Sequence, residues 1–177
     1  MVPAIELKLL GIPAVYAGGK PVNMTLKKAE AILYFMAVET TSTRDALCRL
    51  FWPDSDTEYA RRSLRNALYL IRKHVAEDLL SMPNHSSVQL NKDAVWRCDL
   101  WELEPVQAVT REDLTLLSGF SFKEDEFFQE WLIDQQRSVQ QKIFDHHKKT
   151  ANRLEEEDDY AEAAKAREKM VLIDAYD

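Results

Sequence analysis

The chain has 177 residues, of which 46% are hydrophobic and 30% are charged, with a formal net charge of −7. This composition is typical of a globular protein of one or two domains and excludes a disordered chain. No apolar run approaches the roughly 18 residues that a membrane helix needs. The first ten residues also lack a signal-peptide pattern, so we expect a cytoplasmic protein without membrane contact.

The charge is divided unevenly along the chain. Residues 1–100 carry 13 Lys and Arg against 11 Asp and Glu, a net charge of +2. Residues 101–177 carry 10 against 19, a net charge of −9. The acidity of the whole chain therefore does not exclude nucleic-acid binding by the first half.

The residue types that commonly serve in catalysis and metal binding do not occur here at the spacings that such sites require. Cys48 and Cys98 are isolated, and the four histidines lack the spacing of a metal site, so we expect no disulfide and no metal. We find no nucleophile–base set, no phosphate-binding glycine loop and no paired-carboxylate pocket. The sequence therefore predicts a protein that is not an enzyme and needs no cofactor.

The first part of the chain predicts strands followed by two helices. The apolar residues of Ile5–Leu9 alternate with charged ones, as in a half-buried strand. A hairpin of 14–16 and 21–24 follows, with its turn around Gly18-Gly19. The next predicted element is a helix from its cap Thr25 to Val38. A short helix capped by Ser42 or Thr43 comes after it and ends at Trp52-Pro53-Asp54.

The segment 56–77 is the most informative stretch of the chain. One face of the predicted helix is apolar, with Ala60, Leu64, Ala67, Leu68, Ile71 and Val75. Ser55 and Glu58 form a capping box at its start. The opposite face carries no acidic residue and consists of Arg61, Arg62, Arg65, Asn66, Tyr69, Arg72 and Lys73. Such a helix can pack on a core and present long cationic side chains to phosphates and base edges, although a merely solvated face is the alternative.

A hairpin follows this helix, with strands at Leu79–Met82 and Ser87–Leu90. Three helices followed by a hairpin predict a winged helix-turn-helix, in which the third helix enters the major groove. We expect Arg65 or Asn66 to recognise bases. Helper contacts are predicted from Thr43 and Arg44 at the start of the second helix and from the wing residues Asn84, His85, Ser86 and Ser87.

The second half predicts helices. An amphipathic stretch runs from about Glu124 to Glu157, and a further helix from Tyr160 to Ile173. Phe127, Phe128 and Trp131 are expected in a core. The pattern is typical of an antiparallel helical hairpin of the solenoid type. The predicted fold class is therefore mainly α with a small β content: a winged helix-turn-helix domain followed by a tetratricopeptide-like (TPR-like) all-α domain.

The first half also resembles a known family. Trp52-Pro53-Asp54, Ala60-Arg61, Leu64-Arg65, Ala67-Leu68 and Ile71-Arg72 are similar to the signature of the Streptomyces antibiotic regulatory protein (SARP) family, as are Leu9–Pro13, Lys28-Ala29 and the link Cys98–Leu103. Members are bacterial transcriptional activators with an OmpR-type winged helix. The resemblance implies DNA binding, contact with RNA polymerase and a homodimer on direct repeats.

The second half is similar to the bacterial transcriptional activator domain of the same family. The matching residues are Leu117–Phe120, Trp131, Arg137, Asp159-Tyr160, Ala163 and Ile173-Asp174. The chain has Asp158 where a glycine is usual and Ala175 where a proline is usual. We expect an OmpR-type domain at 1–98 and an activator domain at 99–177, the latter truncated at its C-terminus or unusually short.

Two functions follow from these patterns. The first is a sequence-specific, double-stranded DNA-binding transcriptional regulator. The alternative is a helical protein-interaction module whose winged helix is a scaffold that does not bind DNA, because a fold does not decide a function. The unbroken basic face favours the first, since an interaction surface would more often mix aromatic and apolar residues among the charges.

Overall fold

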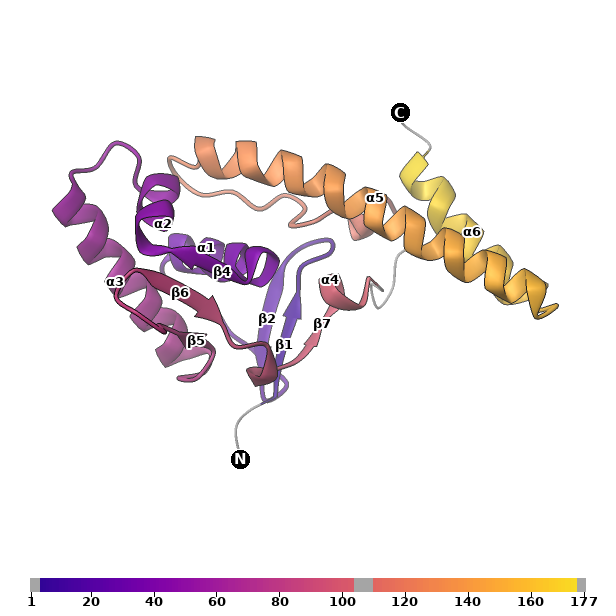
Figure 1. The fold of residues 1–177 in the computed structure, drawn as a ribbon, viewed down its shortest axis with the longest axis horizontal. Coiled ribbons are helices and arrows are strands. Elements are labelled where there is room, and N and C mark those ends of the chain that lie inside the picture. The colour runs from indigo at the N-terminus through magenta and orange to yellow at the C-terminus, as the bar shows by residue number, and fades with distance from the viewer. Residues whose placement is uncertain (1–3, 104–109, 175–177) are drawn as a thin grey trace. The chain divides into compact units, whose positions relative to one another are not determined.

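The computed structural model describes residues 4–103 and 110–174 of the chain (Figure 1). It divides into two compact units. Unit 1 consists of Met1–Leu7, Ala14–Cys98 and Ser121–Glu130, and unit 2 of Lys8–Pro13, Asp99–Phe120 and Trp131–Asp177. The fold is mainly α with a small β content, a winged helix followed by helices, which confirms the predicted fold class.

A four-stranded sheet opens unit 1. It contains β1 (Ile5–Lys8), β2 (Ala14–Ala17), β3 (Lys20–Pro21) and β7 (Val95–Cys98) in the order β3-β2-β1-β7. The predicted hairpin of β2 and β3 is confirmed, and Gly18 (φ 58°) and Gly19 (φ 76°) form its turn in a backbone region that favours glycine. The sequence did not predict β7, which follows the short helix η1 (Lys92–Ala94) and pairs in parallel with β1.

Three helices form the centre of unit 1. They are α1 (Lys27–Glu39), α2 (Arg44–Phe51) and α3 (Thr57–His74), and both α1 and α2 pack against α3. Every residue of α1 from Ala29 to Ala37 is buried, so this helix is the core of the unit. The predicted Thr25 cap is wrong: Leu26 precedes the first turn, and its carbonyl accepts from the Ala29 amide at 2.9 Å without any side-chain cap.

The other two helix starts are held by side chains. Thr43 caps α2 by accepting from the Ala46 amide at 3.1 Å, which confirms one of the two predicted caps. The predicted capping box of Ser55 and Glu58 is wrong, because the extended residue before α3 is Asp56, which accepts from the Tyr59 amide at 2.9 Å. The helix ends at His74 rather than near 77.

The wing is a three-stranded sheet in the order β4-β6-β5. Its strands are β4 (Thr41–Thr43), β5 (Leu80–Ser81) and β6 (Ser87–Leu90). The predicted hairpin of β5 and β6 is confirmed, whereas β4 was not predicted. The Arg44 amide donates to the Ser86 carbonyl at 2.7 Å, so the start of α2 is tied to the tip of the wing.

The segment Ser121–Glu130 completes the core of unit 1. The Phe128 side chain is fully buried, and its ring centroid lies 5.7 Å from that of Phe51 and 5.3 Å from that of Phe122. Lys28 joins this cluster by donating from Nζ to the Phe51 carbonyl at 2.8 Å. The expectation that Phe127 lies in a core is wrong: its side chain is 51% exposed, because neighbouring helical positions point about 100° apart.

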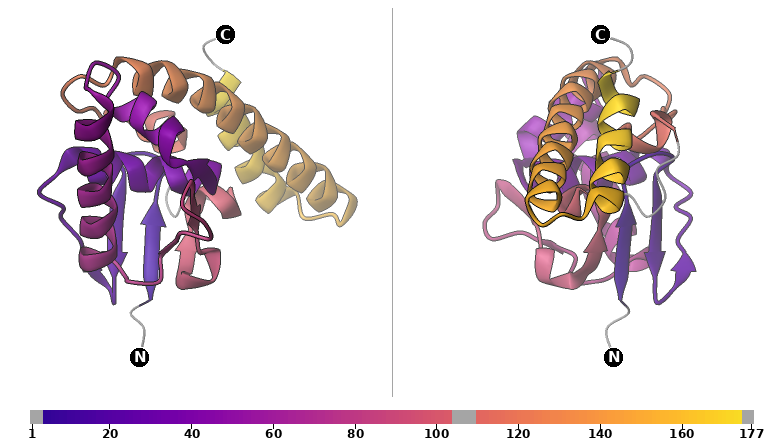
Figure 2. Two further views of the ribbon diagram at one scale, coloured as in Figure 1. Left: turned by 60° about the vertical axis from the view of Figure 1, so that its left-hand side comes forward. Right: turned by 90° about the vertical axis from the view of Figure 1, so that its right-hand side faces the viewer.

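Unit 2 is a helical hairpin with a short preceding segment. Its elements are α4 (Asp99–Glu102), η2 (Glu112–Leu114), the part of α5 (Glu126–Glu156) from Trp131 onward, and α6 (Tyr160–Asp174). Here α5 and α6 run side by side (Figure 2). Both predicted helices are confirmed to within two residues at each end. Asp158, at φ 61°, takes the turn conformation that usually favours glycine.

Both helices of the hairpin bury apolar side chains, several of them small. The buried residues of the hairpin include Ile143 and Ala151 on α5 and Ala163 and Ala166 on α6. Arg167 on α6 donates two hydrogen bonds to Glu155 on α5, from Nε to Oε1 and from Nη2 to Oε2, both at 3.1 Å. Ala175, which stands where the resembled family usually has a proline, lies outside the described residues.

A buried carboxylate organises the other part of unit 2. Asp99, only 3% exposed, accepts from the Leu9 amide at 2.7 Å and from the Leu10 amide at 3.1 Å. Burial raises the pKa of the Asp99 carboxyl, although these two hydrogen bonds act in the opposite direction. The carboxylate therefore holds a chain segment that lies about ninety positions away in the sequence.

Candidate nucleic-acid interface

Five side chains form an outer ridge along α3. Their spacing of three or four residues places them on one stripe of the helix, opposite the buried Ala60, Leu64, Ala67 and Ile71. All five are exposed. The ridge consists of Tyr59, Arg62, Asn66, Tyr69 and Lys73.

Cations pair with the two tyrosine rings of this ridge. The Arg62 guanidinium lies 5.7 Å from the Tyr59 ring centroid, and Lys73 Nζ lies 5.8 Å from that of Tyr69. The two rings are 47% and 58% exposed. Tyr59 was not among the contact residues predicted from the sequence, although its position three residues before Arg62 and seven before Asn66 places it on the same stripe of the helix.

Three arginines flank the ridge, and their environments differ. Arg61 Nη2 lies 3.6 Å from Asp45 Oδ1 on α2. Arg72 donates from Nε to the Glu77 carbonyl at 2.9 Å, and its Nη2 lies 3.8 Å from Glu77 Oε1. Within the described residues, no hydrogen bond or ion pair engages the side chain of Arg65. The flank therefore holds one arginine whose charge is not matched by an acidic partner.

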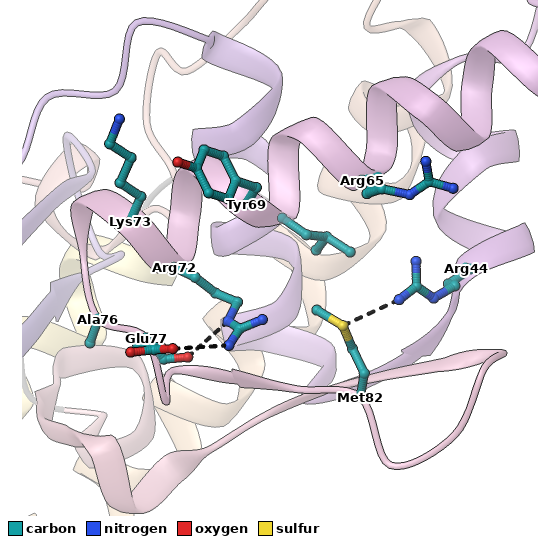
Figure 3. A pocket seen from close by; sticks show the side chains of 9 residues that line it. Arg44, Arg65, Tyr69, Arg72, Lys73, Ala76, Glu77 and Met82 are labelled. Carbon is teal, nitrogen blue, oxygen red and sulfur yellow. Dashed lines mark hydrogen bonds and ion pairs between the residues drawn. The ribbon is translucent and has the colours of Figure 1, made fainter.

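A hollow of about 670 Å³ lies beside α3 (Figure 3). Cationic side chains dominate its lining, with Glu77 as the one acidic lining residue. The lining residues are Arg44, Arg65, Leu68, Tyr69, Arg72, Lys73, Ala76, Glu77 and Met82. The hollow thus brings together four of the predicted contact residues of α3 with the predicted helper Arg44.

The Arg44 side chain is held by an unusual partner. Its Nη2 donates to Met82 Sδ at 3.2 Å, and a thioether sulfur is a weak acceptor. Its Nε is buried and has no hydrogen-bond partner among the described parts of the chain. The guanidinium is therefore positioned at the hollow without a strong acceptor.

Most of the remaining predicted contacts already make hydrogen bonds in the fold. The Thr43 hydroxyl caps α2. Asn84 Oδ1 accepts from the Ser86 amide at 2.9 Å, the Ser86 hydroxyl at 2.8 Å and the Ser87 amide at 2.8 Å. His85 is exposed at the same tip. These hydrogen bonds shape the wing turn and the helix start; the sequence predicted the Thr43 cap but not the hydrogen bonds around Asn84.

Comparison with known proteins gave no matching family model and no matching curated protein. Among solved structures, the chain is similar to Mycobacterium tuberculosis EmbR in complex with a low-affinity phosphopeptide, with a TM-score of 0.51 and 16% identity. The match covers 97% of this chain and 54% of the EmbR chain, so this chain spans about half the length of that protein. At this identity the likeness shows the fold, and at that level it supports the resemblance to SARP-type winged-helix proteins.

Membrane helices and metal-binding groups were considered for the described residues. Over residues 4–103 and 110–174, no helix combines the length and apolar character of a membrane span. In the same ranges, no three His, Cys, Asp or Glu side chains gather as metal ligands would.

Proposed function

We propose that this protein is a sequence-specific, double-stranded DNA-binding transcriptional regulator that inserts α3 into the major groove. The observation that carries the proposal is the exposed face of α3, where Arg62, Asn66 and Lys73 stand on the outer ridge and Arg65 flanks it. Cationic side chains supply the salt-dependent attraction to phosphates, and Arg and Asn are the side chains that pair best with guanine and adenine.

The dimensions of α3 suit this role. Its 18 residues span about 27 Å, and the major groove of about 12 Å admits a single helix. The N-terminal residues of a recognition helix contact the base edges. Tyr59 and Arg62 belong to this part of α3, so we include Tyr59 among the proposed contacts.

The start of α2 and the wing provide the supporting contacts in this proposal. Arg44 lies at the start of α2, where backbone amides and the helix dipole favour a phosphate. The wing tip has no Lys or Arg between Met82 and Leu90, so Asn84, His85, Ser86 and Ser87 contribute hydrogen bonds without a lysine or arginine charge. Loss of Arg44 should consequently cost more affinity than loss of the wing tip.

The helical hairpin serves protein contact in this proposal. Residues 101–177 carry a net charge of −9, which repels a duplex and leaves the hairpin to bind protein. From the SARP resemblance we propose TPR-like packing, contact with RNA polymerase, transcriptional activation and a homodimer on direct repeats. The functional division is DNA binding by residues 1–98 and protein binding by residues 99–177.

Selection of bound sites from a random duplex library by the full chain tests the proposal. We expect an enriched motif, and we expect a gel shift on that motif to weaken strongly in the Arg62→Ala, Arg65→Ala double variant. The matched control is Lys148→Ala, Lys149→Ala, which removes two exposed cations from α5 and should bind as the parent does. An unselective library, or equal binding by both double variants, would favour the scaffold alternative.

A further inference from the structure

The hollow beside α3 joins arginines from two helices. Arg44 comes from α2, and Arg65 and Arg72 come from α3. In Figure 3 the guanidinium groups of Arg65 and Arg44 face the same side of the hollow. Like charges repel at short range, so such a gathering is favourable when an anion lies between them.

The side-chain acceptors that these arginines have in the fold are weak, although Arg72 also donates from Nε to the Glu77 carbonyl at 2.9 Å. Arg44 has the Met82 sulfur for Nη2 and no hydrogen-bond partner for Nε among the described residues. Glu77, which pairs with Arg72 at 3.8 Å, has a side chain that is 91% exposed. An exposed ion pair of this kind contributes little, so Arg72 can exchange it for a stronger acceptor.

A phosphate supplies the acceptors that the hollow lacks. Guanidinium groups form short, paired hydrogen bonds to phosphate oxygens, and these bonds are stronger than those between neutral groups. Lys73 lines the same hollow but lies against the Tyr69 ring on the outer ridge. The arginines are thus the groups best placed to hold one anion.

We infer that Arg44, Arg65 and Arg72 together hold a single phosphate of the duplex backbone in this hollow. The inference rests on the proposed DNA binding and assigns roles within it. Arg65 becomes a backbone contact, which replaces the sequence-based expectation that it recognises a base. Base recognition then belongs to the outer ridge, with Arg62 and Asn66 as the principal residues.

The salt dependence of binding by the full chain tests this assignment. The slope of log K against log salt changes by about 1 for each phosphate that is no longer neutralised. Because three arginines share one phosphate, Arg44→Gln and Arg65→Gln should each lower the slope by less than 1. The Arg44→Gln, Arg65→Gln double variant keeps Arg72, so it should lower the slope further but by no more than about 1. Arg153→Gln, which removes a cation from unit 2, should leave the slope unchanged.

Site preference provides the second measurement. The Arg44 and Arg65 variants should weaken binding equally on all duplexes, whereas Asn66→Ala should relax one position of the selected motif and keep the parent slope. Circular dichroism of each variant checks folding. If Arg44→Gln unfolds, Arg44→Lys keeps the charge and should keep the slope while losing affinity.

The outcomes separate this inference from the proposed function. Suppose that the parent binds duplex DNA. If the Arg44→Gln, Arg65→Gln variant then keeps the parent's salt slope, or if its slope falls by about 2, the assignment of one shared phosphate is wrong while the proposed function stands. A changed base preference in Arg65→Gln also overturns that assignment. A parent that binds no duplex overturns the proposed function and this inference together.

Discussion

Replacing Phe128 with alanine should destabilise the winged-helix unit, although this residue lies outside the sequence that predicted that unit. The side chain is fully buried and contacts the rings of Phe51 and Phe122 at centroid distances of 5.7 and 5.3 Å. A buried Phe→Ala change costs about 3–5 kcal/mol, because it removes apolar contacts and leaves a cavity. A domain of this size is stable by about 5–15 kcal/mol, so the loss is a large fraction of the total.

The adjacent residue supplies the control for this experiment. Phe127 is 51% exposed, so Phe127→Ala should change the free energy of unfolding by no more than about 0.5 kcal/mol. Guanidinium unfolding followed by tryptophan fluorescence measures both variants, and Trp52 lies in the affected cluster, with its ring centroid 6.2 Å from that of Phe51. Equal midpoints for the two variants would refute the assignment of Ser121–Glu130 to the core of unit 1.

Three further predictions concern one buried and two half-buried polar groups. Asp99→Asn should lower the free energy of unfolding by about 1–3 kcal/mol in denaturant titrations, because an amide NH₂ cannot accept from both Leu9 and Leu10. Burial lowers the pKa of Lys28 below 10.5, so the unfolded chain binds the proton more tightly than the folded chain. The free energy of unfolding of the parent, relative to that of Lys28→Met, should therefore rise as the pH increases from neutral toward 10.5. Burial raises the pKa of the Cys48 thiol above 9.0, so alkylation of Cys48 by iodoacetamide at pH 8, followed by mass spectrometry, should be slower in the folded than in the unfolded chain.

Helical periodicity carried most of the sequence-based prediction. The apolar set from Ala60 to Val75 fixed α3 and its exposed basic face, because a period of 3.6 is read locally. The strands β4 and β7 escaped prediction because their partners are distant in the chain, with Thr41 opposite Gln89 and Ile5 opposite Val95. A run of three or four residues gives too little pattern to indicate such a pairing.

The details of the candidate site were less accessible to sequence reasoning. Ser55 and Asp56 are both residues that can cap a helix. The one that does so is the extended residue directly before the first turn, and the structure shows that this residue is Asp56. The ion pair of Arg61 with Asp45 and the contact of Arg44 with Met82 require the tertiary packing of α2 and the wing. Sequence periodicity therefore identified the cationic face, but not which of its members already have partners.

Because the buried and the exposed residues of α3 are different residues, substitutions on its exposed face need not affect the stability of the fold. The residues that stabilise the helix, such as Leu64 and Ile71, share no position with the outer ridge of Tyr59, Arg62, Asn66, Tyr69 and Lys73. Substitutions at exposed positions usually alter stability by no more than about 0.5 kcal/mol. Under the proposed function, the ridge can be randomised as a library and selected for new operators while the hydrophobic core stays constant, so DNA preference and folding can evolve independently.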